Sequence, residues 1–100
     1  MKFAFDNDDV ITKFPKYFSA ITQALSSCKH EIYIITDSCE MYRSQIEKQL
    51  KMDGIEYQHL IITSNKEQYC RNNNIYFIID DTRDYFTKSD VAPMFVCAIR

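Results

Sequence analysis

The sequence contains no tryptophan, one glycine and two prolines among 100 residues. Linkers rich in glycine or proline and low-complexity segments are therefore excluded, and we find no internal repeat. A chain of this length falls within the usual range of one folded unit. We expect a single domain that covers residues 1–100 and has one continuous fold.

Other missing features exclude classes of function. Lysine and arginine form no cluster and the formal net charge is −2, so the electrostatic footprint of a nucleic-acid-binding protein is lacking. No apolar run approaches the ~20 residues that span a bilayer. The first apolar run stops at Asp6, which is too early for a secretory signal. We expect a cytoplasmic protein with no membrane and no stable nucleic-acid partner.

The cysteines lack the spacing of a metal-binding or redox motif. There is no C-x-x-C pair, and the positions are spread over the whole chain. Reduced core thiols explain this distribution better than a disulfide frame or a zinc site. We apply this prediction to Cys28, Cys39, Cys70 and Cys97.

Hydrophobic residues make up 46% of the chain, and many of them lie in short runs that predict β-strands. The first run ends in acidic residues and suits a strand that is buried on both faces. The second is rich in β-branched residues, as central strands are. The predicted strands are Lys2–Phe5, Ile32–Thr36, Tyr57–Ile62, Ile75–Ile79 and Met94–Ile99.

Helical patterns separate these strands. Apolar residues at steps of three or four predict a helix that runs to about Cys28, with Pro15 in its first turn. The residues of this apolar stripe are Phe14, Phe18, Ile21, Leu25 and Cys28. A second apolar stripe consists of Cys39, Tyr42, Ile46 and Leu50, and Gly54 is a natural residue to end that helix.

Two capping signals mark the starts of the later helices. Asp37 and Glu40 have the spacing of a capping box before the second helix. Ser64 and Glu67 have the same spacing before a short third helix. Strands and helices therefore alternate along the chain, which predicts an α/β fold: an open, mainly parallel, Rossmann-like sheet of about five strands with helices on both faces, three layers in all.

Polar residues collect where the predicted strands end. Because ligands bind outside the carboxyl ends of parallel strands, these residues form the candidate site. Carboxylates crowded at one edge repel each other unless a cation lies among them, and hard oxygen ligands favour Mg²⁺. A lysine beside the metal would help to neutralise a bound phosphate. The residues are Asp6, Asn7, Asp8, Asp9, Thr36, Lys66, Asp80 and Asp81.

Four segments of the chain, taken in sequence order, resemble the motifs of the haloacid dehalogenase-like phosphatases. Phe3–Thr12 is similar to the first motif, a hydrophobic strand followed by Asp-x-Asp. Ile32–Thr36 is similar to the second, a strand closed by a hydroxyl residue. Lys66 matches the lysine of the third, and Ile78–Asp81 matches the acidic pair of the fourth. Ile61–Lys66 followed by Phe77–Asp81 is also similar to the corresponding part of the 5′-deoxyribonucleotidase core.

The resemblance implies a hydrolase of phosphate monoesters that acts through an aspartyl-phosphate, with the chain forming a single haloacid dehalogenase-like catalytic core. Asp6 would be the nucleophile, and Asp8 would be the general acid and base. Thr36, Asn7, Lys66 and Asp6 itself would contact the phosphoryl group.

The resemblance also implies a set of ligands for Mg²⁺. These are the carboxylate of Asp6, the backbone carbonyl of Asp8 and one of Asp80 or Asp81. The choice within the acidic pair is open, because Asp80 with Asp84 also fits an Asp-x-x-x-Asp form of the motif. Asp84 is then expected to lie next to the metal ligands without binding the metal itself.

The sequence departs from the family pattern in two respects. The segment between Asp8 and Thr36 is too short for the cap domain that many members use to select substrates. A capless site would accept a small phosphorylated molecule or an exposed phosphate on a larger one, or a second copy of the chain would cover it. In addition, Asp37 adds negative charge beside the phosphate site unless it caps the next helix.

Two other functions compete with the phosphatase. A receiver domain would need a phosphate-accepting aspartate after its third strand, where this chain has Thr63, Ser64 and Asn65. The second is a catalytically silent protein of the same fold that acts as a binding module or a subunit. The intact pair Asp6 and Asp8 argues against it.

Overall fold

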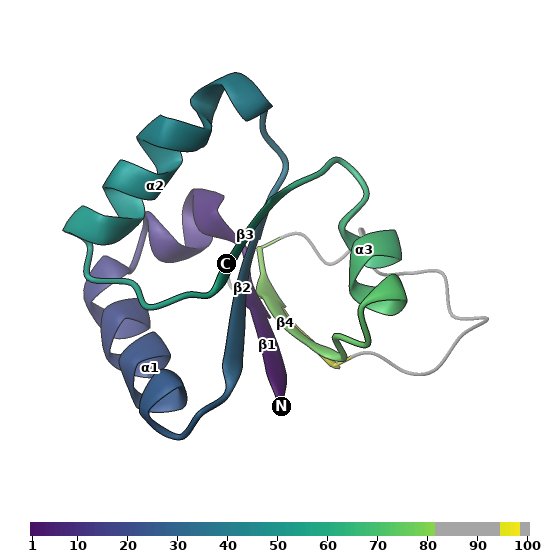
Figure 1. The fold of residues 1–100 in the computed structure, drawn as a ribbon, viewed down its shortest axis with the longest axis horizontal. Helices are drawn as coiled ribbons and strands as arrows, with labels where there is room; N and C mark the ends of the chain where they lie inside the picture. The colour runs from purple at the N-terminus through teal and green to yellow at the C-terminus, as the bar shows by residue number, and fades with distance from the viewer. Residues whose placement is uncertain (82–94, 99–100) are drawn as a thin grey trace.

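The computed structural model describes residues 1–81 and 95–98, and its centre is a parallel β-sheet (Figure 1). Strands β1 (Lys2–Phe5), β2 (Glu31–Thr36), β3 (His59–Ile62) and β4 (Phe77–Asp80) all run in the same direction. A short strand β5 (Phe95–Ala98) lies parallel to β4. The order across the sheet is β3-β2-β1-β4-β5, so the first strand of the sequence lies in the middle.

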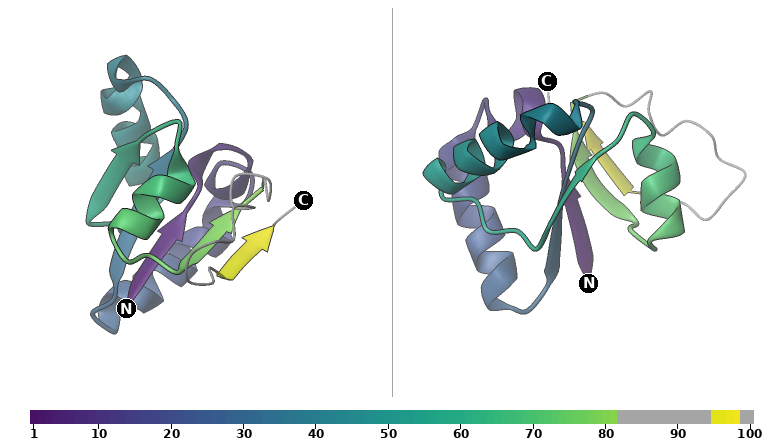
Figure 2. Two further views of the ribbon diagram at one scale, coloured as in Figure 1. Left: turned by 90° about the vertical axis from the view of Figure 1, so that its right-hand side faces the viewer. Right: turned by 45° about the horizontal axis from the view of Figure 1, so that its top comes forward.

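Helices lie on both faces of this sheet. Helices α1 (Pro15–Ser27) and α2 (Arg43–Met52) lie on one face, and α3 (Lys66–Asn72) lies on the other (Figures 1 and 2). A loop η1 (Asn7–Ile11), in which Asp8 and Asp9 are not helical, follows β1, and a 3₁₀ turn η2 (Glu40–Tyr42) precedes α2. The prediction of an α/β fold with a parallel sheet and alternating strands and helices is confirmed.

Two apolar clusters join the layers, because successive residues of a strand point to opposite faces. Phe5, Ile32 and Ile34 pack with Phe18 of α1 and Leu50 of α2. On the other face the sheet packs against α3. The buried members of that second cluster are Ala4, Tyr33, Ile35, Cys70, Ile75 and Ile78.

The predicted boundaries of β2, β3 and β4 differ from the structure by one or two residues. Strand β2 begins at Glu31 instead of Ile32, and β4 ends at Asp80 instead of Ile79. Strand β3 begins at His59 instead of Tyr57, and β4 begins at Phe77 instead of Ile75. Of the predicted fifth strand, Met94 and Ile99 lie outside the described residues.

Both predicted capping boxes are wrong. The residue before η2 is Cys39 and the residue before α2 is Tyr42, and neither helix start receives a side-chain cap from Asp37. At α3 the cap is Asn65, whose side chain accepts a hydrogen bond from the Gln68 N–H. Asparagine caps as well as serine does, so the adjacent residue took the role predicted for Ser64.

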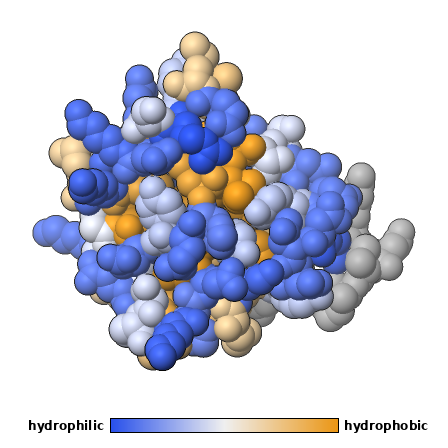
Figure 3. Space-filling view, viewed as in Figure 1, coloured by the Kyte–Doolittle hydropathy of each residue, from blue (hydrophilic) through white to orange (hydrophobic). Residues whose placement is uncertain are grey.

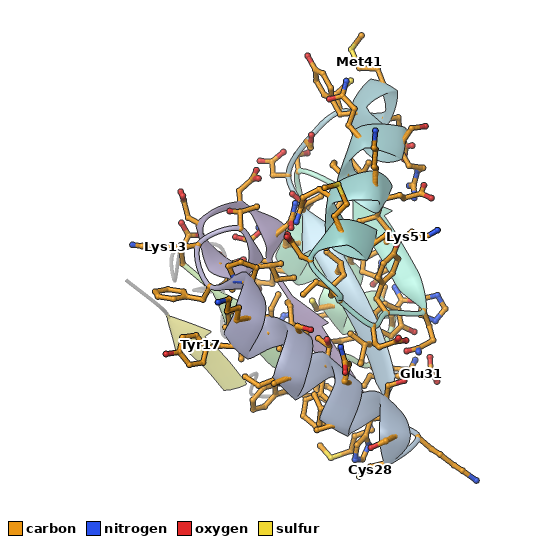
Figure 4. The ribbon with its side chains drawn as sticks, turned by 90° about the vertical axis from the view of Figure 1, so that its left-hand side faces the viewer. Lys13, Tyr17, Cys28, Glu31, Met41 and Lys51 are labelled. Atoms are coloured by element: carbon orange, nitrogen blue, oxygen red, sulfur yellow. The ribbon has the colours of Figure 1, made fainter. Side chains whose placement is uncertain are left out.

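The cysteine prediction holds only in part. Cys28, Cys39 and Cys70 are free thiols, but only Cys70 is in the core. Cys28 follows the last turn of α1 at the end of the molecule shown in Figure 4, and Cys39 is exposed before α2 begins. Burial raises the pKa of the Cys70 thiol to about 12, so this group stays protonated.

Helix α1 is turned slightly from the predicted orientation. Ile21 is 41% exposed, whereas Thr22 is fully buried. The Thr22 hydroxyl donates to the Phe18 carbonyl at 2.7 Å and accepts from the Glu56 N–H at 3.1 Å. Burial of this polar side chain is therefore satisfied by two hydrogen bonds, one of them to the segment after α2.

Gly54 ends α2 as predicted, with a φ of +72° that residues with a side chain rarely adopt. A Cβ atom at this position would lie 2.9 Å from the Ser19 hydroxyl oxygen of α1. Ser19 and Gln23 both donate to the Gly54 carbonyl, so the end of α2 is tied to α1.

Polar side chains cover the outer surfaces of the helices on the face shown in Figure 3, and an apolar area remains visible at its centre. In the part of the chain that the structure describes, every helix is too short or too polar to cross a membrane.

Candidate functional site

Asp6 is held by the backbone at the carboxyl end of the central strand. Its N–H donates to the Ile79 carbonyl at 2.9 Å, which extends the pairing of β1 with β4 by one residue. Its carboxylate oxygen Oδ1 accepts from the Asn7 N–H at 2.9 Å. Asp6 is only 3% exposed, so both its backbone and its side chain are fixed within the protein.

Lys66 contacts Asp6 from the start of α3. It is the first residue of α3, and the Asn65 cap fixes the start of that helix. The ammonium nitrogen Nζ donates to Asp6 Oδ1 at 2.8 Å and to Asp80 Oδ2 at 3.1 Å. All three side chains are almost completely buried. Lysine is rarely buried without such partners, so its position is set by these two carboxylates.

Asp6, Asp80 and Asp81 each offer a carboxylate oxygen, and these oxygens lie within 4.8 Å of one another. Asp80 ends β4 and is fully buried, while Asp81 follows it and is half-buried. We call Asp6, Asp80, Asp81 and Lys66 together the Asp6 cluster. Within these four side chains, three carboxylates lie beside one ammonium group.

The electrostatics of the cluster follow from its burial and from these charges. Burial, with the charge of Asp80, raises the pKa of Asp6 from 3.8 to about 7, although Lys66 opposes the shift. Burial alone would lower the pKa of Lys66, but the hydrogen bonds and charges of Asp6 and Asp80 outweigh it and hold that pKa above its ordinary value. The lysine therefore stays charged and the nearby carboxyl resists ionisation.

The donor set fits a divalent cation. Carboxylate oxygens at this spacing are the ligands that Mg²⁺ and Ca²⁺ prefer. Asp84, predicted to support the ligands, lies outside the described residues.

Asp8 lies in a different environment. It is exposed and extended in the loop after β1, and its carboxylate is not one of the three oxygens that gather at Asp6. Asp9 next to it has a φ of 61°, and its N–H donates to the Thr12 hydroxyl. The Asp8 side chain is therefore exposed to solvent, and its role as an acid and base remains a prediction.

Thr36 is the last residue of β2 and is 1% exposed. Since Phe5 pairs with Ile34, Thr36 lies at the same edge of the sheet as the residues that follow β1. Asp37 is exposed immediately after it. The position of Thr36 is the predicted one, and its contact with phosphate remains a prediction.

Asn7 has partners that the sequence did not indicate. Its amide nitrogen Nδ2 donates to Gln49 Oε1 of α2 at 2.9 Å, and Gln49 Nε2 donates to Asp53 Oδ2 at 2.8 Å. Its amide oxygen Oδ1 is the one buried side-chain polar atom without a hydrogen-bond partner in residues 1–81. Leaving such an acceptor unpaired costs about 1–3 kcal/mol.

The side chain of Asn7 is thus directed by α2. Its phosphate-binding role, predicted from its place between two aspartates, stays a prediction. Gln49 and Asp53 carried no signal in the sequence, because a glutamine and an aspartate four residues apart on a charged helix are ordinary surface residues.

Comparison of the chain with family models, curated proteins and solved structures finds no match in any of the three. The site must therefore be interpreted from its own residues and geometry.

Proposed function

We propose that the protein is a Mg²⁺-dependent phosphatase with a three-layer, five-stranded haloacid dehalogenase-like core and no cap domain. The observation that carries the proposal is the bridge that Lys66 makes between Asp6 and Asp80 at the carboxyl edge of the sheet. A buried lysine between two carboxylates costs desolvation energy, so such a cluster is typical of functional sites.

In this mechanism a carboxylate oxygen of Asp6 attacks the phosphorus of a phosphate monoester. A bond forms between the Asp6 oxygen and phosphorus, the bond from phosphorus to the ester oxygen breaks, and Asp8 gives its proton to the departing oxygen. Water then attacks the phosphorus of the aspartyl-phosphate. Asp8 accepts a proton from that water, and inorganic phosphate and free Asp6 are released.

Lys66 and Thr36 support the same reaction by binding phosphoryl oxygens as charge develops on them. Lys66 already lies 2.8 Å from the nucleophile, and its pKa is held above the ordinary value, so it is charged at neutral pH. Attack needs an ionised Asp6, and a neighbouring cation favours that form.

The cation would be held by the carboxylates of Asp6 and of Asp80 or Asp81, with the Asp8 backbone carbonyl as a further ligand. When bound, Mg²⁺ would offset the negative charge of the phosphoryl group and of the carboxylates around it. The crowding of three carboxylate oxygens within 4.8 Å supports this assignment.

The proposed substrates are nucleotide-like monophosphates or exposed phosphates on larger molecules. The described residues include no second folded unit above the carboxyl edge of the sheet. A second copy of the chain would be one way to enclose a small substrate.

One observation favours a second candidate, a catalytically silent binding protein of the same fold. Asp37 does not cap a helix, and its charge is exposed next to Thr36, where it repels a phosphate dianion. The silent protein would bind Mg²⁺ through the Asp6 cluster but would not turn over phosphate esters.

The deciding experiment measures hydrolysis of p-nitrophenyl phosphate with Mg²⁺, with EDTA, and in the variant Asp6→Asn. We expect turnover that EDTA abolishes and that Asp6→Asn lowers at least about 10³-fold, since the nucleophile is lost. Glu56→Gln is the control, because Glu56 is exposed in the segment after α2 and is not part of the candidate site. If the wild type hydrolyses neither this ester nor a panel of nucleoside monophosphates and phosphopeptides, the binding protein replaces the phosphatase.

A further inference from the structure

A line of hydrogen bonds runs from the end of α2 to the loop that follows β1. Asp53 accepts from Gln49, and Gln49 accepts from Asn7, whose position in the sequence is 42 residues away. Asn7 is almost fully buried, while Gln49 and Asp53 are half-buried. We call these three residues the Asn7 relay.

The relay has a fixed direction. An ionised carboxylate can only accept hydrogen bonds, so Asp53 makes Gln49 turn its NH₂ group toward the end of α2. The oxygen of Gln49 must then face Asn7, and Asn7 must present its own NH₂ group to Gln49. The amide oxygen of Asn7 is left as a buried acceptor with no donor among the described residues. The charge of Asp53 thus sets the orientation of a side chain that is two hydrogen bonds away.

The position of Asp53 is not explained by the stability of α2. It follows the last residue of the helix, where the partial negative charge of the helix end disfavours an acidic side chain. Lys51 is the basic residue in that last turn and suits it better. The hydrogen bond to Gln49 gives Asp53 a specific function at an otherwise unfavourable place.

The relay reaches the candidate nucleophile through the backbone of Asn7. The Asn7 N–H donates to Asp6 Oδ1, the same oxygen that accepts from Lys66. Two donors on one oxygen fix the rotation of the Asp6 carboxylate. A shift of the Asn7 backbone would therefore turn the carboxylate with it.

We propose that Gln49 is a positioning residue, which holds Asn7 so that the Asn7 N–H keeps the Asp6 carboxylate in one orientation. The structural part of this proposal concerns the loop after β1 alone, and the kinetic part rests on the proposed phosphatase function. Because the two parts have separate measurements, either can fail without the other.

The structural measurement is hydrogen exchange of the backbone N–H of Asn7, followed by NMR in the full chain. We call this N–H the Asn7 amide. In Gln49→Met we expect protection of this amide to fall about tenfold or more, with amides of β2 and α1 unchanged, since only the local opening becomes easier. The matched control is Gln68→Met. Gln68 makes the same kind of contact, to Asn72 four residues later, on an exposed face of α3. Unchanged protection of Asn7 in a folded Gln49→Met protein would overturn the proposal.

A rescue variant tests the direction of the relay. Gln49→Glu alone places two carboxylates side by side and should lower the protection of the Asn7 amide. In the double variant with Asp53→Asn, the new carboxylate can accept from the NH₂ groups of both Asn7 and the asparagine at position 53. We expect the double variant to recover protection to within about twofold of the wild type. A double variant as impaired as Gln49→Glu would contradict the proposed direction.

The kinetic measurement applies to the same variants. A misplaced nucleophile should lower kcat about 10- to 100-fold and change KM much less, because Thr36 and Lys66, which the substitution leaves intact, would still bind the phosphoryl group. A purely structural defect would lower the active fraction and the melting temperature together. An equal fall in Gln68→Met would overturn the positioning role, whereas absence of turnover in the wild type would reject the phosphatase and leave the exchange result to decide.

Discussion

The ammonium group of Lys66 lies 2.8 Å from Oδ1 of Asp6, although 60 residues separate them in the sequence. The two side chains are 3% and 4% exposed, so water screens their interaction little. The same nitrogen also donates to Asp80. One ammonium group therefore contacts two buried carboxylates, and these contacts determine how the site responds to mutation and to pH.

Lys66→Met should destabilise the protein by about 3–5 kcal/mol at pH 8 in EDTA, because Asp6 and Asp80 would both lose the buried ammonium group that they contact. Urea unfolding followed by circular dichroism measures this loss. The loss should shrink at pH 5, where a buried carboxyl is protonated more readily. Lys48→Met on the exposed face of α2 is the control, with an expected change within about 0.5 kcal/mol. A loss below about 1 kcal/mol in Lys66→Met would contradict the buried pairing.

The stability of the metal-free protein should decrease as pH rises through the range in which Asp6 titrates. Its pKa is about 7 in the folded state and 3.8 ordinarily, so between these values the folded state binds more protons than the unfolded state. Asp6 therefore makes its full contribution to the free energy of unfolding below pH ~4. This contribution is at most about 4 kcal/mol, and it is lost by pH ~7 to 8.

Comparison of the wild type with Asp6→Asn isolates this contribution from those of other titrating groups. The unfolding free energy of the wild type minus that of Asp6→Asn should decrease as the pH is raised from 4.5 to 8 in EDTA. A difference that is independent of pH would show that the Asp6 carboxyl titrates normally.

Thr36→Val should lower kcat/KM for p-nitrophenyl phosphate about 10- to 100-fold and leave the melting temperature unchanged or slightly higher. A hydrogen bond to a charged group contributes about 1.5–3 kcal/mol, and valine keeps the shape of the side chain without the hydroxyl. Thr36→Ser retains the hydroxyl and should recover most of the activity. Equal activity in the valine and serine variants would remove Thr36 from the phosphate site.

Gly54→Ala should cost about 1–2 kcal/mol of stability, because a φ of +72° is unfavourable for alanine. The added Cβ would also approach the Ser19 hydroxyl oxygen at 2.9 Å. Urea unfolding of Gly54→Ala, Ser19→Ala and the double variant separates the two causes. If the backbone dominates, the two changes should add, whereas a double variant less destabilised than that sum would assign part of the cost to the contact.

The strands and the first helix could be predicted because their signals are local and strong. Short runs such as Ile32–Thr36 are too apolar for a loop and too β-branched for a surface helix, and Pro15 marks the start of α1 within one residue. Capping boxes are weaker signals, because one polar residue competes with its neighbour. Asn65 replaced Ser64 for that reason.

Part of the site could be predicted because of the way in which parallel strands are arranged. Parallel strands bring their carboxyl ends to one edge, so Asp6, Asp80 and Asp81 had to lie close together once the strands were placed. The contact of Lys66 with Asp6 was not predicted, only its place beside the phosphate. Gln49 and Asp53 could not be found, because their importance depends on how α2 lies against the loop after β1.

The central position of β1 has a consequence for how the site is made during synthesis. Strand β1 is translated before β4, and Ala4 pairs with Ile78 of β4, so this part of the sheet closes only after β4 has been translated. Contacts between such distant segments form late and slowly. A nascent or proteolysed chain that lacks β4 carries Asp6 but neither Asp80 nor Asp81. Incomplete molecules should therefore be unable to assemble the acidic cluster, and the cell would contain either the finished site or none.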